Sequence, residues 1–241
     1  MTDERWGKRE NNYEITANEE LLLPKEYGDF NKMFACGIIE KEFEYSHEIA
    51  WERFYRTEIR IKRKSGIEDI VPVIMSEMLV EEYLNVSVKG KVMEASGHFR
   101  SYNRVDNSGC HLDLFLYATS LKIYDADEKN KEFFHRNIIY FNGFICRKPV
   151  FRITPLGRKI ADLFIAVNRK HGKTDYIPCI VWEKGALWAK KFEIGTQVVI
   201  YGRVQSRKYF KKDTSDSDTG VWKQVNEVCV VRIQKVKDIP I

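Results

Sequence analysis

The 241-residue chain has no run of the roughly 20 consecutive apolar residues that a membrane-spanning helix needs. Its first ten residues, MTDERWGKRE, are mostly charged or polar, so no signal peptide is expected and a cytoplasmic location is the default. Phosphate-binding glycine loops, GxSxG and HExxH motifs are also missing. These absences argue against an enzyme.

Cysteine is scarce as well. The five cysteines are an odd number and include no CxxC pair, which is typical of reduced thiols in an intracellular core. The cysteine nearest a histidine directly precedes it, and adjacent residues rarely ligate one metal ion. We therefore expect no metal site and no cofactor. The cysteines are Cys36, Cys110 (beside His111), Cys146, Cys179 and Cys229.

Positive charge is abundant, and it is unevenly distributed. The whole chain has a net charge of +5, but residues 136–238 contain 21 Lys and Arg against 9 Asp and Glu, a net of +12. Residues 31–125 contain 13 against 15, a net of −2. A basic module fused to a slightly acidic one indicates that the second half meets a polyanion, although a charged face can also simply be solvated.

An internal repeat divides the chain. Residues 31–77 align without a gap on residues 137–183, at a constant offset of 106. The repeat predicts an N-terminal extension (1–30), a first domain (31–125), a linker (126–135) and a second domain (136–241). Matching positions include Asn31 and Asn137, Gly37 and Gly143, Arg63 and Arg169, Asp69 and Asp175, and Pro72 and Pro178.

Each copy has the pattern of a small barrel. Five runs rich in Val, Ile, Phe and Tyr predict strands, and one stretch with helical spacing lies between the third and the fourth. This order is the OB-fold plan, so we expect an all-β protein with short helices: two tandem OB-fold five-stranded barrels. The second-copy strands are Ile138–Ile145, Lys159–Asn168, Tyr176–Glu183, Gln197–Gln205 and Gln224–Val236, with a helix at Lys184–Glu193. The first copy has the corresponding helix at Met78–Asn85.

The third strand of the second copy has two different faces. The odd-numbered positions of Ile177–Val181 are apolar and suit the barrel interior, whereas Tyr176, Ile180 and Trp182 point outward. Outward rings beside cations can stack on bases, or they can simply cover hydrophobic surface or an oligomer interface. The cations that we expect to contact phosphate are Arg147, Lys148, Arg152, Arg158, Lys159, Arg169, Lys170, Lys173, Arg207 and Lys208.

These segments are recognisable. The runs RKPVFRITPLGR (147–158), ADLFIAVNR (161–169), TDYIPCIVWE (174–183) and GRVQSRKY (202–209) resemble the bacterial single-stranded-DNA-binding protein family over residues 136–236. The resemblance implies base stacking at Tyr176, Trp182, Tyr209 and His171, with Trp222 following a flexible hairpin loop at 211–220. It also implies particles with four barrels, hence a homodimer of this two-barrel chain.

The first copy departs from this pattern. Ser76, Ile70 and Ser65 stand opposite Trp182, Tyr176 and His171. Its role is left open among dimer contact, weaker DNA wrapping and protein binding. Acidic residues are also frequent at its start: Glu40, Glu42, Glu44 and Glu48.

The last four residues, Asp238, Ile239, Pro240 and Ile241, are similar to the acidic tip with which the family recruits replication or repair proteins, but only one acid is present.

The function expected is sequence-independent binding of single-stranded DNA in replication, recombination or repair. The alternative is a tandem-OB protein-interaction scaffold or a primosome-type replication accessory protein. DNA versus RNA and the host process stay open.

Overall fold

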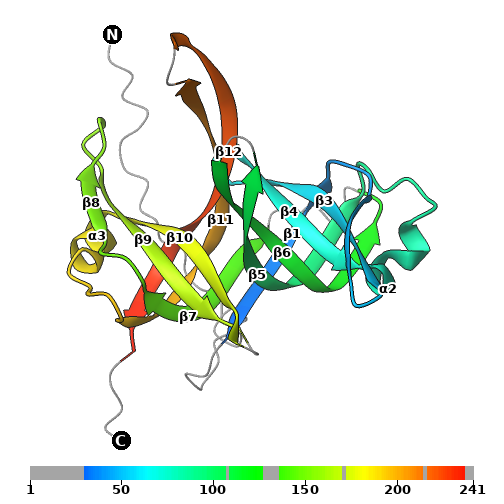
Figure 1. The fold of residues 1–241 in the computed structure, drawn as a ribbon, viewed down its shortest axis with the longest axis horizontal. Coiled ribbons are helices and arrows are strands. Elements are labelled where there is room, and N and C mark those ends of the chain that lie inside the picture. Colours follow the sequence, from blue (N-terminus) through cyan, green and yellow to red (C-terminus); the bar gives the residue numbers. More distant parts are fainter. Residues whose placement is uncertain (1–29, 107–108, 127–135, 170–171, 214–215, 237–241) are drawn as a thin grey trace, which may run out of the picture.

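A computed structural model describes residues 30–106, 109–126, 136–169, 172–213 and 216–236. They form a single twelve-stranded sheet that curls into two barrels lying side by side (Figure 1). The first-barrel strands are β1 (Asn31–Ile39), β2 (Glu44–Ile49), β3 (Glu52–Lys62), β4 (Glu68–Ser76), β5 (Val92–Asp106) and β6 (Gly109–Tyr124). The second-barrel strands are β7 (Asn137–Ile145), β8 (Val150–Ile153), β9 (Lys159–Asn168), β10 (Thr174–Trp182), β11 (Gln197–Asp213) and β12 (Asp216–Lys235).

Five strands close each barrel. In the first, β1 pairs with both β3 and β5, and the parallel pair β4–β6 completes the ring. In the second, β7 pairs with β9 and β11, and β10–β12 is the parallel pair. The short strands β2 and β8 lie outside these rings, paired with β3 and β9. The prediction of two five-stranded OB-fold barrels is confirmed, with one additional short strand in each.

Glycine makes the closure possible. A Cβ added to Gly37 would lie 2.5 Å from the carbonyl oxygen of Arg60, and one added to Gly143 would lie 2.6 Å from that of Ala166. The two glycines sit where β1 meets β3 and where β7 meets β9, so a side chain there would separate the closing strands. This close approach explains why glycine recurs at the same position of the repeat.

The helices lie between the third and fourth barrel strands, as the sequence indicates. Helix α3 (Glu183–Ala189) closes one end of the second barrel, and α2 (Glu77–Val80) with the 3-10 turn Glu81–Tyr83 does so in the first. They are shorter than predicted and lie at opposite ends of the molecule (Figure 1). No helix among the described residues is long and apolar enough to cross a membrane.

One prediction about the second barrel is wrong. Strand β11 continues to Asp213 and β12 starts at Asp216, so most of the segment expected as a loop, 211–220, belongs to a two-stranded ribbon. This ribbon projects beyond the barrel (Figure 1). The cross-strand pairing between Lys208–Lys212 and Gly220–Gln224 satisfies backbone groups that a loop would expose.

The two barrels are related by a pseudo-two-fold arrangement. Strands β1 and β7 pair antiparallel, with Asn31 opposite Phe141 and Ala35 opposite Asn137. At the centre of this pairing lie Met33 and Ile139, which occupy equivalent positions of the repeat, 106 residues apart, and are both buried. The tandem repeat therefore folds as a covalently linked dimer of barrels that share a core.

Candidate nucleic-acid interface

The outer face of the second barrel consists of the sides of β9 and β10 that point away from the interior. Ile177 and Val181 point inward and are buried, whereas Tyr176 points outward and is 39% exposed. Trp182 lies on the same outer face and is half-buried. The division of this strand into two faces is thus as the alternation predicts.

A stacked row of side chains crosses this face. The Phe164 ring lies parallel to the Tyr176 ring at a tilt of 12°, with centroids 6.0 Å apart. The Arg147 guanidinium carbon lies 4.4 Å from the centroid of Phe164. Phe164 was not among the residues expected from the sequence to stack, although the same alternation along β9 that buries Leu163 and Ile165 turns it outward. The row presents π-faces and a cation together.

Trp182 lies above a small apolar cluster on the outer face. The ring packs against Ile160, Ile180 and Cys229, which are buried. The Arg158 guanidinium carbon lies 4.4 Å from the ring centroid. Trp182 therefore covers apolar surface and also presents a ring beside a cation, and its stacking on bases stays a prediction.

The predicted phosphate contacts differ in their surroundings. Arg152 pairs with Asp162 at 2.7 Å and Arg158 with Glu183 at 3.1 Å, and all four side chains are exposed. Arg207 lies 3.6 Å from Glu227. The two exposed pairs, of Arg152 and Arg158, are weak, so a phosphate can compete for these arginines, whereas the partner of Arg207 is mostly buried. The exposed lysines of the predicted set that the structure describes are Lys148, Lys159, Lys173 and Lys208.

Arg169 is placed differently from what the sequence suggested. It donates from Nε to Asp175 Oδ2 at 2.7 Å, and Asp175 is fully buried. Arg100 and the Ser101 N–H of the first barrel donate to the same carboxylate, at 3.1 and 2.6 Å, and the Tyr176 N–H donates to Ser101 Oγ. We call these five residues the Asp175 cluster. Because its guanidinium is engaged there, Arg169 joins the barrels rather than facing a phosphate.

The same arrangement recurs at the pseudo-symmetric position. Arg63 donates to the buried Asp69, which also accepts the Ser206 N–H of the second barrel at 2.7 Å. The Ile70 N–H donates to Ser206 Oγ at 3.0 Å. The first barrel has a ribbon of its own, formed by β5 and β6. Each barrel thus holds the base of the other barrel's ribbon through a buried carboxylate that binds a serine.

Other predicted residues can be located only in part. Lys170, His171 and the four residues Asp238–Ile241 lie outside the described residues. Tyr209 and Trp222 lie on β11 and β12, on adjoining rungs of the ribbon, opposite Lys223 and Phe210. Their roles in stacking and partner binding stay predictions.

The first barrel keeps aromatic rings on its outer face, but at other positions. Phe54 is buried there, stacked on His47 at 4.9 Å and tilted against Tyr117 at 6.0 Å. Phe54 pairs with Ser76, as Ile160 pairs with Trp182 in the second barrel. In the first barrel the aromatic ring therefore comes from β3, the strand beside β4, and this ring of Phe54 is buried under His47 and Tyr117. Ser65 is exposed in the turn between β3 and β4, and Ile70 is half-buried.

Its acidic residues are mostly engaged. Glu40 accepts from Arg60 at 2.6 Å, and Glu44 from Arg56 at 3.1 Å. Glu42 accepts from the Ser87 hydroxyl and from the Val88 N–H, and these hydrogen bonds lower the pKa of Glu42. The acids therefore fix local structure in the first barrel.

The cysteines are free thiols. Burial raises the pKa of Cys36, Cys146, Cys179 and Cys229, which keeps these thiols protonated and unreactive, whereas Cys110 is exposed. Among the residues described, no group of three or more His, Cys, Asp and Glu side chains is placed to hold a metal ion.

Known proteins share this sequence pattern. Residues 136–236 match the Single-strand binding protein family. "Single-stranded DNA-binding protein 2" of Listeria innocua is 33% identical over 84 residues, which are 32% of this chain and 53% of that protein. The chain thus spans about half the length of this relative.

The fold has a solved counterpart. The structure of the wild-type single-stranded DNA binding protein from Thermus aquaticus superposes with a TM-score of 0.67 at 16% identity, over 88% of this chain and 95% of that one. This likeness concerns the fold, which both chains share across two barrels. "Single-stranded DNA-binding protein B" of Bacillus subtilis is 30% identical over 102 residues, 38% of this chain and 82% of that protein. With the second barrel matching the family and 82% of a curated member aligned to it, the chain belongs to the Single-strand binding protein family.

Proposed function

We propose that this chain binds single-stranded DNA, without catalysis, on the outer face of its second barrel. The observation that carries the proposal is the row formed by Arg147, Phe164 and Tyr176, with Trp182 and Arg158 on the same face. Every base has a π-face, so stacking is tolerant of sequence and contributes about 1–3 kcal/mol per base. The relatives named above carry single-stranded DNA binding in their names, which supports the same function.

The strand's phosphates would lie against the cations around this face. Neutralised phosphates release counterions, so affinity falls as salt rises. The exposed lysines of the second barrel and its weakly paired arginines suit this contact, and its net charge of +12 over residues 136–238 suits the approach of a polyanion. Replication, recombination or repair are the processes in which such binding would serve.

We expect the protein to bind oligo-dT in preference to a duplex of the same length. Stacking on Tyr176 and Trp182 requires unpaired bases, so tryptophan fluorescence should fall on binding and affinity should decrease steeply with salt. Titration at several salt concentrations measures both. Trp51 is 93% exposed and adds background, so Trp182→Phe identifies the quenched indole.

Equal affinity for single strand and duplex would refute the proposal. A protein that binds neither would instead favour the alternative of a protein-interaction scaffold. Running the same titration with oligo-rU measures the preference between DNA and RNA, because stacking and phosphate contacts serve both.

We also propose that two chains form a homodimer through the outer side of the sheet around β1 and β7. Four apolar side chains there remain half-exposed on both sides of the pseudo-two-fold centre. A closed two-fold dimer is the commonest homo-oligomer and would bring four barrels together. The side chains are Phe34, Ile38, Ile138 and Tyr140.

Sedimentation at micromolar concentration should therefore give twice the chain mass of 28.4 kDa. Phe34→Asp with Ile138→Asp should shift the protein to monomer, because charge would be buried at the contact. Lys184→Asp, a change at an exposed position on helix α3 and away from β1 and β7, provides a charged control. A wild-type monomer at all concentrations would contradict this assembly.

A further inference from the structure

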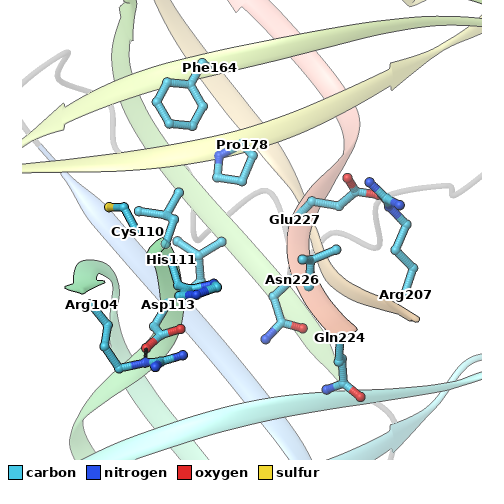
Figure 2. Close-up of a pocket in the computed structure, with 13 residues that line it drawn as sticks. Arg104, Cys110, His111, Asp113, Phe164, Pro178, Arg207, Gln224, Asn226 and Glu227 are labelled. Carbon is cyan, nitrogen blue, oxygen red and sulfur yellow. Dashed lines mark hydrogen bonds and ion pairs between the residues drawn. The ribbon is translucent and has the colours of Figure 1, made fainter. Parts of the chain in front are cut away.

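A cleft of about 530 Å³ lies between the two barrels. Figure 2 shows Phe164 and Pro178 of the second barrel on one side, and Cys110 and His111 of the first barrel's β6 on another. Asn226, from the β11–β12 ribbon, lines a third side. The cleft thus has walls from both barrels, and its volume is in the range of small-ligand sites.

One wall of the cleft is suited to an aromatic ring. Phe164 and Pro178 are cross-strand neighbours that expose apolar surface toward the cleft. At the same register of the first barrel, Pro72 pairs with Glu58, which bonds to Lys41 at 2.9 Å. Phe164 of the second barrel therefore occupies the position at which the first barrel has Glu58, an acid engaged in an ion pair.

A second wall contains a buried polar group that lacks a partner. Among the described residues, the Oδ1 atom of Asn226 is buried and accepts no hydrogen bond. Asn226 pairs with Ser206 across the ribbon, and the matching pair in the first barrel is Ser101 with Leu114, which is 4% exposed. Leu114 is apolar, so its burial costs no hydrogen bond, whereas the buried and unpaired Oδ1 of Asn226 destabilises the fold. A donor from a ligand would remove this cost.

We infer that the cleft takes one base of the bound strand with its ring against Phe164, and that the Asn226 amide turns toward the cleft so that its Oδ1 accepts from an exocyclic amino group of the base. This inference rests on the proposed function and adds a subsite to it. The first barrel then contributes to binding through its β6 wall, although its own outer face has no exposed ring at the Trp182 position. Cytosine and adenine carry such an amino group, and thymine does not.

Cys110 offers a direct test of occupancy. Its thiol is exposed and lines the cleft, and the other four cysteines are buried or half-buried. With oligo-dC at about ten times its dissociation constant, about nine-tenths of the chains are occupied, so N-ethylmaleimide should modify Cys110 about tenfold more slowly. Mass spectrometry of the Cys110 peptide measures this rate, and oligo-dC binding is followed in parallel by anisotropy.

The outcomes that overturn the inference are distinguishable from one another. If oligo-dC binds while Cys110 reacts at the rate of the free protein, the cleft is not a subsite and the proposed function stands. If no single strand binds, the proposed function fails together with the subsite. Protection of Cys110 by duplex at the same concentration would also count against a base in the cleft.

Base identity tests the Asn226 contact. We expect oligo-dC to bind about threefold or more tightly than oligo-dT, the range of one hydrogen bond. Asn226→Leu installs the residue of the sister ribbon, so it should fold and should bind both oligonucleotides equally. Asn85→Leu makes the same chemical change at an exposed position in the turn after Glu81–Tyr83 of the first barrel and should keep the preference. A preference that survives Asn226→Leu, or that is missing in the wild type, refutes this contact.

Discussion

Replacing Asp175 with alanine is expected to lower the free energy of unfolding by about 3 kcal/mol. The change removes the acceptor of Arg169, Arg100 and the Ser101 N–H at once. Two guanidiniums would then lie in the contact between the barrels without a counter-charge. We take the low end of the range for broken buried pairs because these arginine side chains are 24% and 20% exposed and can reach some water. Urea denaturation followed by circular dichroism measures the loss.

The pseudo-symmetry supplies an internal control. Asp69→Ala should also destabilise the fold but somewhat less, because Asp69 holds the Ser206 N–H and one arginine, Arg63, where Asp175 holds two. Asp162→Ala breaks only an exposed pair with Arg152 and should cost less than about 1 kcal/mol. If Asp175→Ala is as mild as Asp162→Ala, the Asp175 cluster does not hold the barrels together.

The strand pattern predicted much of the fold because barrel interiors impose an alternation that can be read locally. The inward positions of β10 and the outward Tyr176 and Trp182 follow directly from it. Phe164 follows from the same alternation on β9 and could have been found by applying it there. The boundary between ribbon and loop at 211–220 could not, since polar residues are common in both.

The contact between the barrels could not be predicted from the pattern of residues within a single strand. Arg169 and Asp175 are six residues apart and resemble an ordinary hairpin pair, whereas Ser101 lies 74 residues from Asp175 along the chain. The repeat shows that two copies exist, but the pairing of β1 with β7 depends on which edges meet. Arg169 was therefore expected at a phosphate, because its charge was visible in the sequence and its buried acceptor was not.

On the binding side, Trp182→Leu is expected to raise the dissociation constant for oligo-dT about tenfold or more. One stacked ring contributes about 1–3 kcal/mol, and every 1.4 kcal/mol is a factor of ten. Leucine keeps apolar cover over Ile160, Ile180 and Cys229, so the loss reports the ring rather than an exposed cluster. Fluorescence anisotropy of a labelled oligonucleotide measures the constant, and thermal melting of each variant checks the fold.

Tyr176→Leu should weaken binding by a similar factor, since Tyr176 contributes the exposed ring of the row with Phe164. Ser76→Ala, at the position of the first barrel that matches Trp182, should change affinity little because serine has no π-face. All variants are best compared in the intact chain, because separated halves would lose the β1–β7 pairing and the buried carboxylate contacts. If Ser76→Ala weakens binding as much as Trp182→Leu, the strand does not depend on the rings of the second barrel, and the first barrel must hold it in another way.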